Sequence, residues 1–123
     1  MDVTPLVPTD RQLIQSYGNG GFRISGTSHA GSVLVFPSRT VAWPVSLVSE
    51  IDGASLVDIA TERPQILLIG TGATFALLPS VLKRAMREHG SVIEAMDTGA
   101  ACRTYNVLLT EGRSVAAALL AVD

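Results

Sequence analysis

Residues 66–72 read ILLIGTG, a run of four apolar side chains that passes directly into Gly70-Thr71-Gly72. A continuous apolar run of this length is typical of a strand covered on both faces, as the central parallel strands of an α/β sheet are. The two glycines that follow permit a sharp turn of the backbone. The stretch therefore predicts a buried parallel strand at 66–69 that ends in a tight loop.

The segments after this loop continue the alternation of helix and strand. Pro79 and Gly90 suit the first turn and the end of a helix, and the apolar residues 78, 81, 82, 85 and 86 fall on one face of it. Residues 92–96 form the next expected strand, which we also expect to be buried and parallel, and Asp97 or Thr98 caps a helix that runs to about residue 110. Residues 114–122 fit a strand better than a helix.

The segments before the loop are shorter. Residues 17–21 are rich in turn formers, while 22–24, 32–36 and 40–43 have the patterns of short strands. Ser55 and Asp58 match a capping pattern that opens a helix, which Pro64 stops. We expect a flexible N-terminal arm at 1–13 and a single α/β domain at 14–123, with a mixed, mostly parallel central sheet in three layers and helices on its faces.

The composition excludes several classes of protein. Apolar residues make up 47% and charged residues 16% of the 123 residues, which argues against disorder and suggests a partly apolar surface. A net charge of −2 gives no basic field for nucleic acid. The N-terminus lacks a secretory pattern, and the longest apolar run, 115–122, is too short to span a bilayer. We expect a cytoplasmic protein without a transmembrane segment.

Two turns carry the candidate site. Gly70-Thr71-Gly72 has backbone N–H groups that can hold an anion, but it lacks the third glycine of a dinucleotide site and the lysine of a P-loop, so a tight turn without a ligand is the alternative. Asp97 and Thr98 follow the next strand. If the two strands are parallel neighbours, both turns meet at the sheet edge where α/β proteins build crevices. The alternative for Asp97 is a simple helix cap.

The helix from residue 98 has two faces. Cys102 falls on its apolar side and is expected to be a buried structural thiol, without His or carboxylate in reach. Arg103 and Asn106 share a polar stripe, which we expect to point toward the Gly70–Gly72 turn, with Arg103 paired to Asp97; a solvated face is the alternative.

No catalytic motif, metal-ligand spacing or cofactor fingerprint is present in the sequence. The candidate residues for binding a ligand or partner are Gly70, Thr71, Gly72, Asp97, Thr98, Arg103 and Asn106.

Several of these motifs together resemble one family, a small bacterial and archaeal domain of unknown function. Its mitochondrial members include the NADH:ubiquinone oxidoreductase (complex I) assembly factor three. The matching segments are Gly18 to Phe22, Gly31 to Val35, Trp43, Leu67 to Gly72, Met96 to Thr98, Ala101 to Asn106, and Glu111 to Arg113. The resemblance implies a three-layer fold with one strand opposing the others. It also implies a link to complex I assembly through protein partners, and no established enzymatic activity.

Two functional hypotheses follow. The first is a non-catalytic protein-binding module with an assembly or chaperone-like role. Its partners would be respiratory complex subunits or assembly factors, with peripheral membrane association allowed. The second is a binding protein or enzyme for a small acidic ligand, held by Thr71, Asp97, Arg103 and Asn106.

Overall fold

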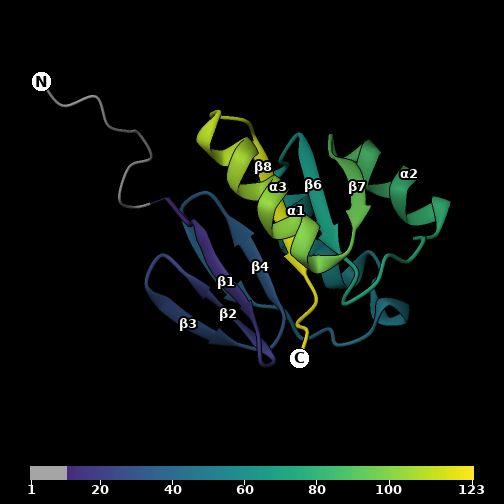
Figure 1. Cartoon of the computed structure of the whole chain (residues 1–123). Coiled ribbons are helices and arrows are strands. Elements are labelled where there is room, and N and C mark those ends of the chain that lie inside the picture. The colour runs from purple at the N-terminus through teal and green to yellow at the C-terminus, as the bar shows by residue number, and fades with distance from the viewer. Residues whose placement is uncertain (1–10) are drawn as a thin grey trace, which may run out of the picture.

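Two β-sheets and three α-helices make up the described part of the chain, residues 11–123, in the computed structural model (Figure 1). The larger sheet has the strand order β5-β4-β8-β6-β7 and the smaller one the order β1-β2-β3. The strands are β1 Ile14–Gly18, β2 Gly21–Ile24, β3 Thr27–Ala30, β4 Val33–Phe36, β5 Arg39–Ala42, β6 Ile66–Gly70, β7 Val92–Met96 and β8 Val115–Leu119. The helices are α1 Val57–Glu62, α2 Ser80–Glu88 and α3 Thr98–Thr110, with 3₁₀ turns η1 Val48–Glu50 and η2 Ala54–Leu56.

The strand directions confirm a mixed sheet. β6 runs parallel to both β7 and β8, whereas β4 is antiparallel to both β5 and β8, so β4 alone opposes the other four strands. The chain moves from β6 outward to β7 through α2 and then back across β6 to β8 through α3. Because such crossovers are right-handed, opposite directions of travel place the two helices on opposite faces.

The central sheet separates two apolar cores, which gives the three layers. Alternate residues of β8 point to opposite faces, with 115, 117 and 119 on one side and 116 and 118 on the other. The first face is covered by α3 and the three-stranded sheet, and the second by α1, α2 and the segment around Trp43. All five residues of β8 are buried, because it lies between β4 and β6 and is covered on both faces.

The prediction of a buried parallel strand is confirmed for β6 and only partly correct for β7. β7 is parallel to β6, but Val92 is 47% exposed and Glu94 is exposed as well. The reason is that Val92 and Glu94 face the side of the sheet on which α3 lies mainly over β8 and β6, whereas Ile93 faces α2 and is buried.

The expected helix cap at Ser55 is wrong. Ser55 lies inside η2, where three hydrogen bonds join it to Asp52. The Ser55 N–H donates to Asp52 Oδ1 at 2.8 Å, the Asp52 N–H donates to Ser55 Oγ at 3.0 Å, and that hydroxyl donates to the Asp52 carbonyl at 2.8 Å. α1 begins at Val57 without a side-chain cap. Ser55 and Asp52 stabilise the short turn before the helix instead.

The apolar face expected for α2 is wider than the face that the structure buries. Leu82 and Met86 are buried, but Val81 is 67% exposed. The helix rests on the sheet with a narrow stripe, and Val81 lies to one side of it.

The three-stranded sheet was not predicted beyond the strand at 22–24. Asn19 and Gly20 both have positive φ and form the β1–β2 hairpin turn. Of the expected arm at 1–13, residues 1–10 lie outside the described residues. Gln12 and Leu13 are hydrogen-bonded to the domain. The Gln12 N–H donates to the Pro37 carbonyl, and the Leu13 N–H donates to the Ser25 hydroxyl, each at 2.9 Å.

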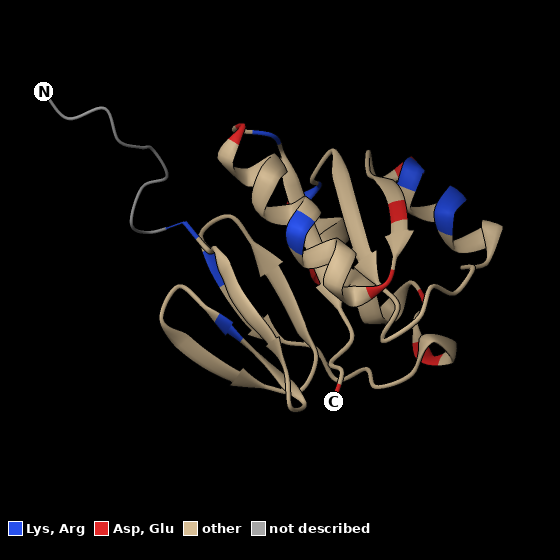
Figure 2. Ribbon diagram, in the orientation of Figure 1, with Lys and Arg blue, Asp and Glu red and all other residues tan. Residues whose placement is uncertain are grey.

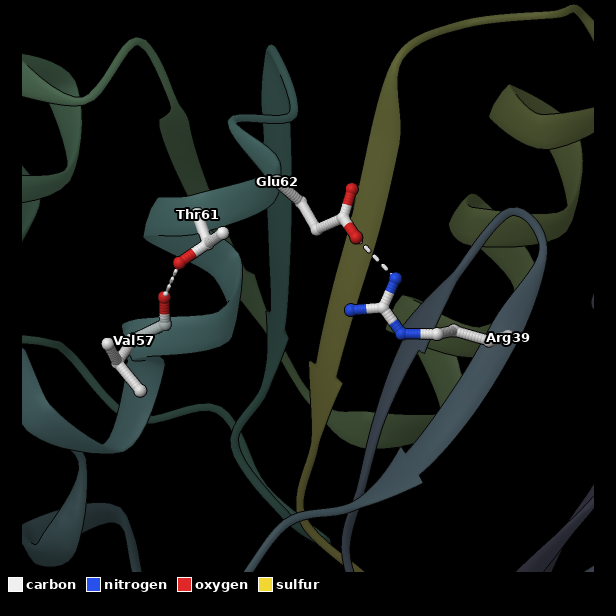
Figure 3. Close-up of polar contacts among 4 residues, drawn as sticks. All are labelled: Arg39, Val57, Thr61 and Glu62. Atoms are coloured by element: carbon white, nitrogen blue, oxygen red, sulfur yellow. Dashed lines mark hydrogen bonds and ion pairs between the residues drawn. The ribbon is translucent and has the colours of Figure 1, made fainter.

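A surface ion pair joins the hairpin β4–β5 to α1. The Arg39 guanidinium bonds the Glu62 carboxylate (Figure 3) and also lies 4.3 Å from the centre of the Phe36 ring. In the same helix, the Thr61 hydroxyl donates to the Val57 carbonyl at 3.0 Å.

Candidate functional site

The two turns singled out in the sequence meet at one edge of the central sheet. The Thr71 N–H donates to the Met96 carbonyl at 2.8 Å, and the Thr98 N–H donates to the Gly72 carbonyl at 2.9 Å. This contact confirms that Gly70–Gly72 and Asp97–Thr98 lie side by side, as parallel neighbouring strands require.

The polar groups of these turns are used within the protein. The Gly72 N–H donates to Thr98 Oγ1 at 3.0 Å, and that hydroxyl donates to the Leu120 carbonyl at 2.8 Å. The Thr71 hydroxyl donates to the Thr74 carbonyl at 2.7 Å and accepts from the Ala76 N–H at 3.1 Å. Both threonines are buried, at 5% and 0% exposure. The N–H groups of Thr71 and Gly72 are therefore committed to internal acceptors rather than open to an anion.

Close packing explains two of the glycines. A Cβ on Gly70 would lie 2.9 Å from Thr98 Cα, so any side chain there would push the two turns apart. A Cβ on Gly99 would lie 2.4 Å from the hydroxyl oxygen of Tyr17. Gly99 thus allows Tyr17 of β1 to lie against the first turn of α3.

The expectation that Asn106 points toward the Gly70–Gly72 turn is wrong. Asn106 Oδ1 accepts from the Ile14 N–H at 2.9 Å, and its Nδ2 donates to the Ile14 carbonyl at 2.8 Å. The side chain therefore closes a two-bond clamp on the backbone of β1 and fastens the three-stranded sheet to α3.

Asp97 and Arg103 remain at the surface of this edge. Asp97 Oδ1 accepts from the Ala100 N–H at 2.9 Å and so caps α3, as expected. The expected Asp97–Arg103 ion pair is not formed, since within residues 11–123 the single ion pair is Arg39–Glu62. Arg103 does reach back along the helix, because its Nη1 lies 3.4 Å from where a Cβ on Gly99 would be.

Two hollows flank this first turn of α3. One, of about 470 Å³, is lined by Tyr17, the loop residues 72–73, Asp97, Gly99 and the chain end 121–123. The other, of about 450 Å³, is lined by residues 14–17 with Cys102, Arg103 and Asn106. Tyr17 borders both and is 44% exposed. We call Tyr17, Asp97 and Arg103 the α3 N-terminal surface; Gly99 is buried beneath Tyr17. Tyr17 was not selected from the sequence as a site residue, because the stretch in which it lies indicated only a turn.

Two buried polar side chains lie behind this surface. Cys102 is 3% exposed, and burial raises the pKa of its thiol to about 12, so the nucleophilic thiolate is absent at neutral pH. Two charges act on the thiol after burial: the Arg103 guanidinium lowers its pKa and the Asp97 carboxylate raises it. The Tyr105 hydroxyl is fully buried without a hydrogen-bond partner in residues 11–123, and burial raises the pKa of this phenol above its ordinary value.

Helices in the described part of the chain are all too short or too polar to cross a membrane.

The structure is a small three-layer α/β domain. The turns that follow β6 and β7 are hydrogen-bonded to each other and fix the start of α3. The chain belongs to the family described as protein of unknown function (DUF498/DUF598), whose model matches residues 14–120.

Three similar proteins illustrate the family's range. An uncharacterized protein of Rhodobacter capsulatus is 38% identical over 107 residues, covering 87% of this chain and 82% of that protein. The human NADH dehydrogenase [ubiquinone] 1 alpha subcomplex assembly factor 3 is 38% identical over 109 residues, covering 87% of this chain and 59% of the human protein. The solved structure of a Bartonella henselae protein, described as an outer membrane protein, has a TM-score of 0.86 at 38% identity and covers 94% of this chain and 98% of that one.

Proposed function

We propose that this chain is a non-catalytic protein-binding module that acts in the assembly of a respiratory NADH dehydrogenase. The observation that carries the proposal is the 38% identity to the human assembly factor, which extends over 87% of this chain. The chain spans 59% of the human relative, so the proposal concerns only the part of that protein that this chain matches.

The geometry of the candidate site supports binding over catalysis. Its hydroxyls and turn N–H groups are tied up in internal bonds, and its thiol is held neutral by burial. The groups left at the surface are the Tyr17 ring, the Asp97 carboxylate and the Arg103 guanidinium. Tyrosine and arginine are among the residues enriched at the positions that contribute most to binding in protein–protein interfaces. We propose that the α3 N-terminal surface contacts the partner.

The small-ligand hypothesis has less support. It needs free N–H donors at Thr71 and Gly72 and a free Asn106 amide, and these groups bond Met96, Thr98 and Ile14 instead.

Affinity purification from the native host tests the proposal. We expect the tagged chain to co-purify with subunits or assembly intermediates of NADH dehydrogenase. Arg103→Ala should reduce that recovery while the unfolding temperature changes little, because its side chain is exposed at the surface. Tyr17→Ala should reduce recovery per folded molecule as well, although removing the ring that packs against Gly99 should also lower the unfolding temperature.

A matched control is Arg113→Ala, which removes an exposed arginine at the other end of α3. Recovery that is unchanged in the Arg103 and Tyr17 variants would exclude this surface. Absence of any NADH dehydrogenase subunit from the wild-type preparation would exclude the assembly role itself.

A further inference from the structure

The loop before α2 and the first turn of α2 carry several exposed apolar side chains. Among the described residues, eight large apolar side chains are exposed, and three of them fall within residues 75–81. They are Phe75 at 55%, Leu77 at 79% and Val81 at 67% exposure. Their neighbours Leu78 and Leu82 fill the core beneath α2, so these three are not needed for packing. Three large exposed apolar side chains within seven residues mark this loop and the start of α2 as a candidate interaction site.

Helix α2, which follows this loop, carries a large share of the positive charge of the chain. Lys83, Arg84 and Arg87 are three of the nine Lys and Arg residues of the chain, and they lie in one helix of nine residues (Figure 2). The chain as a whole has a net charge of −2. None of the three forms an ion pair within residues 11–123. Their charges are therefore open to an external carboxylate.

We propose that Phe75, Leu77, Val81, Lys83, Arg84 and Arg87, the α2 surface, dock a segment of a partner protein that is both acidic and apolar. The apolar side chains supply desolvation energy, and the cations select for acidic residues around the apolar contact. This inference deepens the proposed function and rests on it for the partner's role in assembly.

A protein segment fits this surface better than an anionic membrane. Glu88 lies in the same helix as the three cations, and the negative net charge of the chain opposes a uniformly anionic surface at longer range. The apolar side of α2 is turned inward, with Leu82 and Met86 buried, so the helix cannot lay a continuous apolar face into lipid. A protein partner can match both signs of charge locally.

Fluorescence anisotropy with synthetic peptides tests the proposal on the full chain. The probes are an amphipathic glutamate–leucine peptide, a glutamate–serine peptide of equal charge, and a lysine–leucine peptide. We expect only the glutamate–leucine peptide to bind. A Lys83→Glu, Arg84→Glu, Arg87→Glu variant should weaken its binding at least about tenfold, as should Leu77→Ser with Val81→Ser.

The control variant replaces exposed arginines elsewhere, Arg23→Glu, Arg63→Glu and Arg113→Glu, and makes the same change in net charge. It should keep binding within about twofold. The proposal is overturned if the control loses as much affinity as the α2 variant, or if the glutamate–serine peptide binds equally well. It is also overturned if vesicles containing phosphatidylserine bind through the α2 surface while no peptide does, or if the surface mediates only self-association.

The two proposals fail separately. If the α2 variant still co-purifies fully with NADH dehydrogenase subunits, the α2 surface is excluded and the assembly role stands. If the peptide binds through α2 but no such subunit is recovered with the wild-type chain, the assembly role is excluded and the surface stands.

Discussion

The clamp between Asn106 and Ile14 can be tested by removing the amide. Asn106→Ala deletes two hydrogen bonds, of 2.9 and 2.8 Å, and leaves the partly buried Ile14 N–H and C=O without partners. A hydrogen bond contributes about 1 kcal/mol net, and an unsatisfied buried group costs about 1–3 kcal/mol. We expect the free energy of unfolding to fall by about 2–4 kcal/mol, a large part of the total of about 5–15 kcal/mol for a typical domain.

Urea unfolding measures this loss, with the midpoint shifted and the slope unchanged. Because the clamp holds the three-stranded sheet, amide exchange should also speed up in β1 and β2 more than in β6. Asn106→Asp keeps the acceptor for the Ile14 N–H but places a carboxylate oxygen opposite its carbonyl, so it should also destabilise. Arg103→Ala, exposed on the same helix, is the control and should change stability by less than about 0.5 kcal/mol.

The reasoning is refuted if Asn106→Ala unfolds within about 0.5 kcal/mol of wild type. If the same variant then lost its partner, Asn106 would be a binding residue, and the three-stranded sheet would depend on its apolar contacts alone.

Three further perturbations follow from the structure. Gly70→Ala should lower thermal stability by about 1–3 kcal/mol, because the new methyl lies 2.9 Å from Thr98 Cα; a variant as stable as wild type would show that the paired turns can separate freely. Cys102 should react slowly with thiol reagents at pH 8, and rapid labelling would contradict its burial. Burial raises its folded pKa to about 12, so above about pH 8.5 only the unfolded chain ionises. Between about pH 8.5 and pH 10, below the range in which the buried Tyr105 phenol adds a decrease of its own, stability should fall by up to about 1.4 kcal/mol per pH unit. Cys102→Ala, measured by urea unfolding over these pH values, should lack that decrease. Arg39→Ala should cost at most about 1 kcal/mol in thermal unfolding, because the side chains of its pair with Glu62 are 45% and 41% exposed; a larger loss would mean that the contact with Phe36 dominates.

Sequence patterns within single helices and strands were sufficient to predict much of the secondary structure and burial of this protein. The apolar run 66–69 indicated a buried strand, and the spacing of polar and apolar residues after Asp97 indicated both the cap and the buried face of α3. The burial of Cys102 followed from that face. Each of these features depends on side chains a few residues apart, whose relative placement is set by the geometry of a helix or a strand.

Strand order, in contrast, depended on tertiary contacts. β8 comes last in the chain but lies between β4 and β6, which leaves β7 at the edge with Val92 exposed. The short apolar patterns of β7 and β8 do not reveal which of them has two neighbours, because position in a sheet is a property of the whole arrangement.

The roles of the site residues depended on tertiary contacts as well. Asn106 has a polar side chain on a mostly buried helix, and its partner Ile14 is 92 residues away in the sequence. Gly99 is required by Tyr17, another distant residue, which lies in β1. The sequence alone therefore determined which side chains were polar and which face of each helix they occupied. Only the folded chain decided that Asn106 binds β1 while Arg103 stays at the surface, because hydrogen bonds between distant segments exist only after the layers have packed.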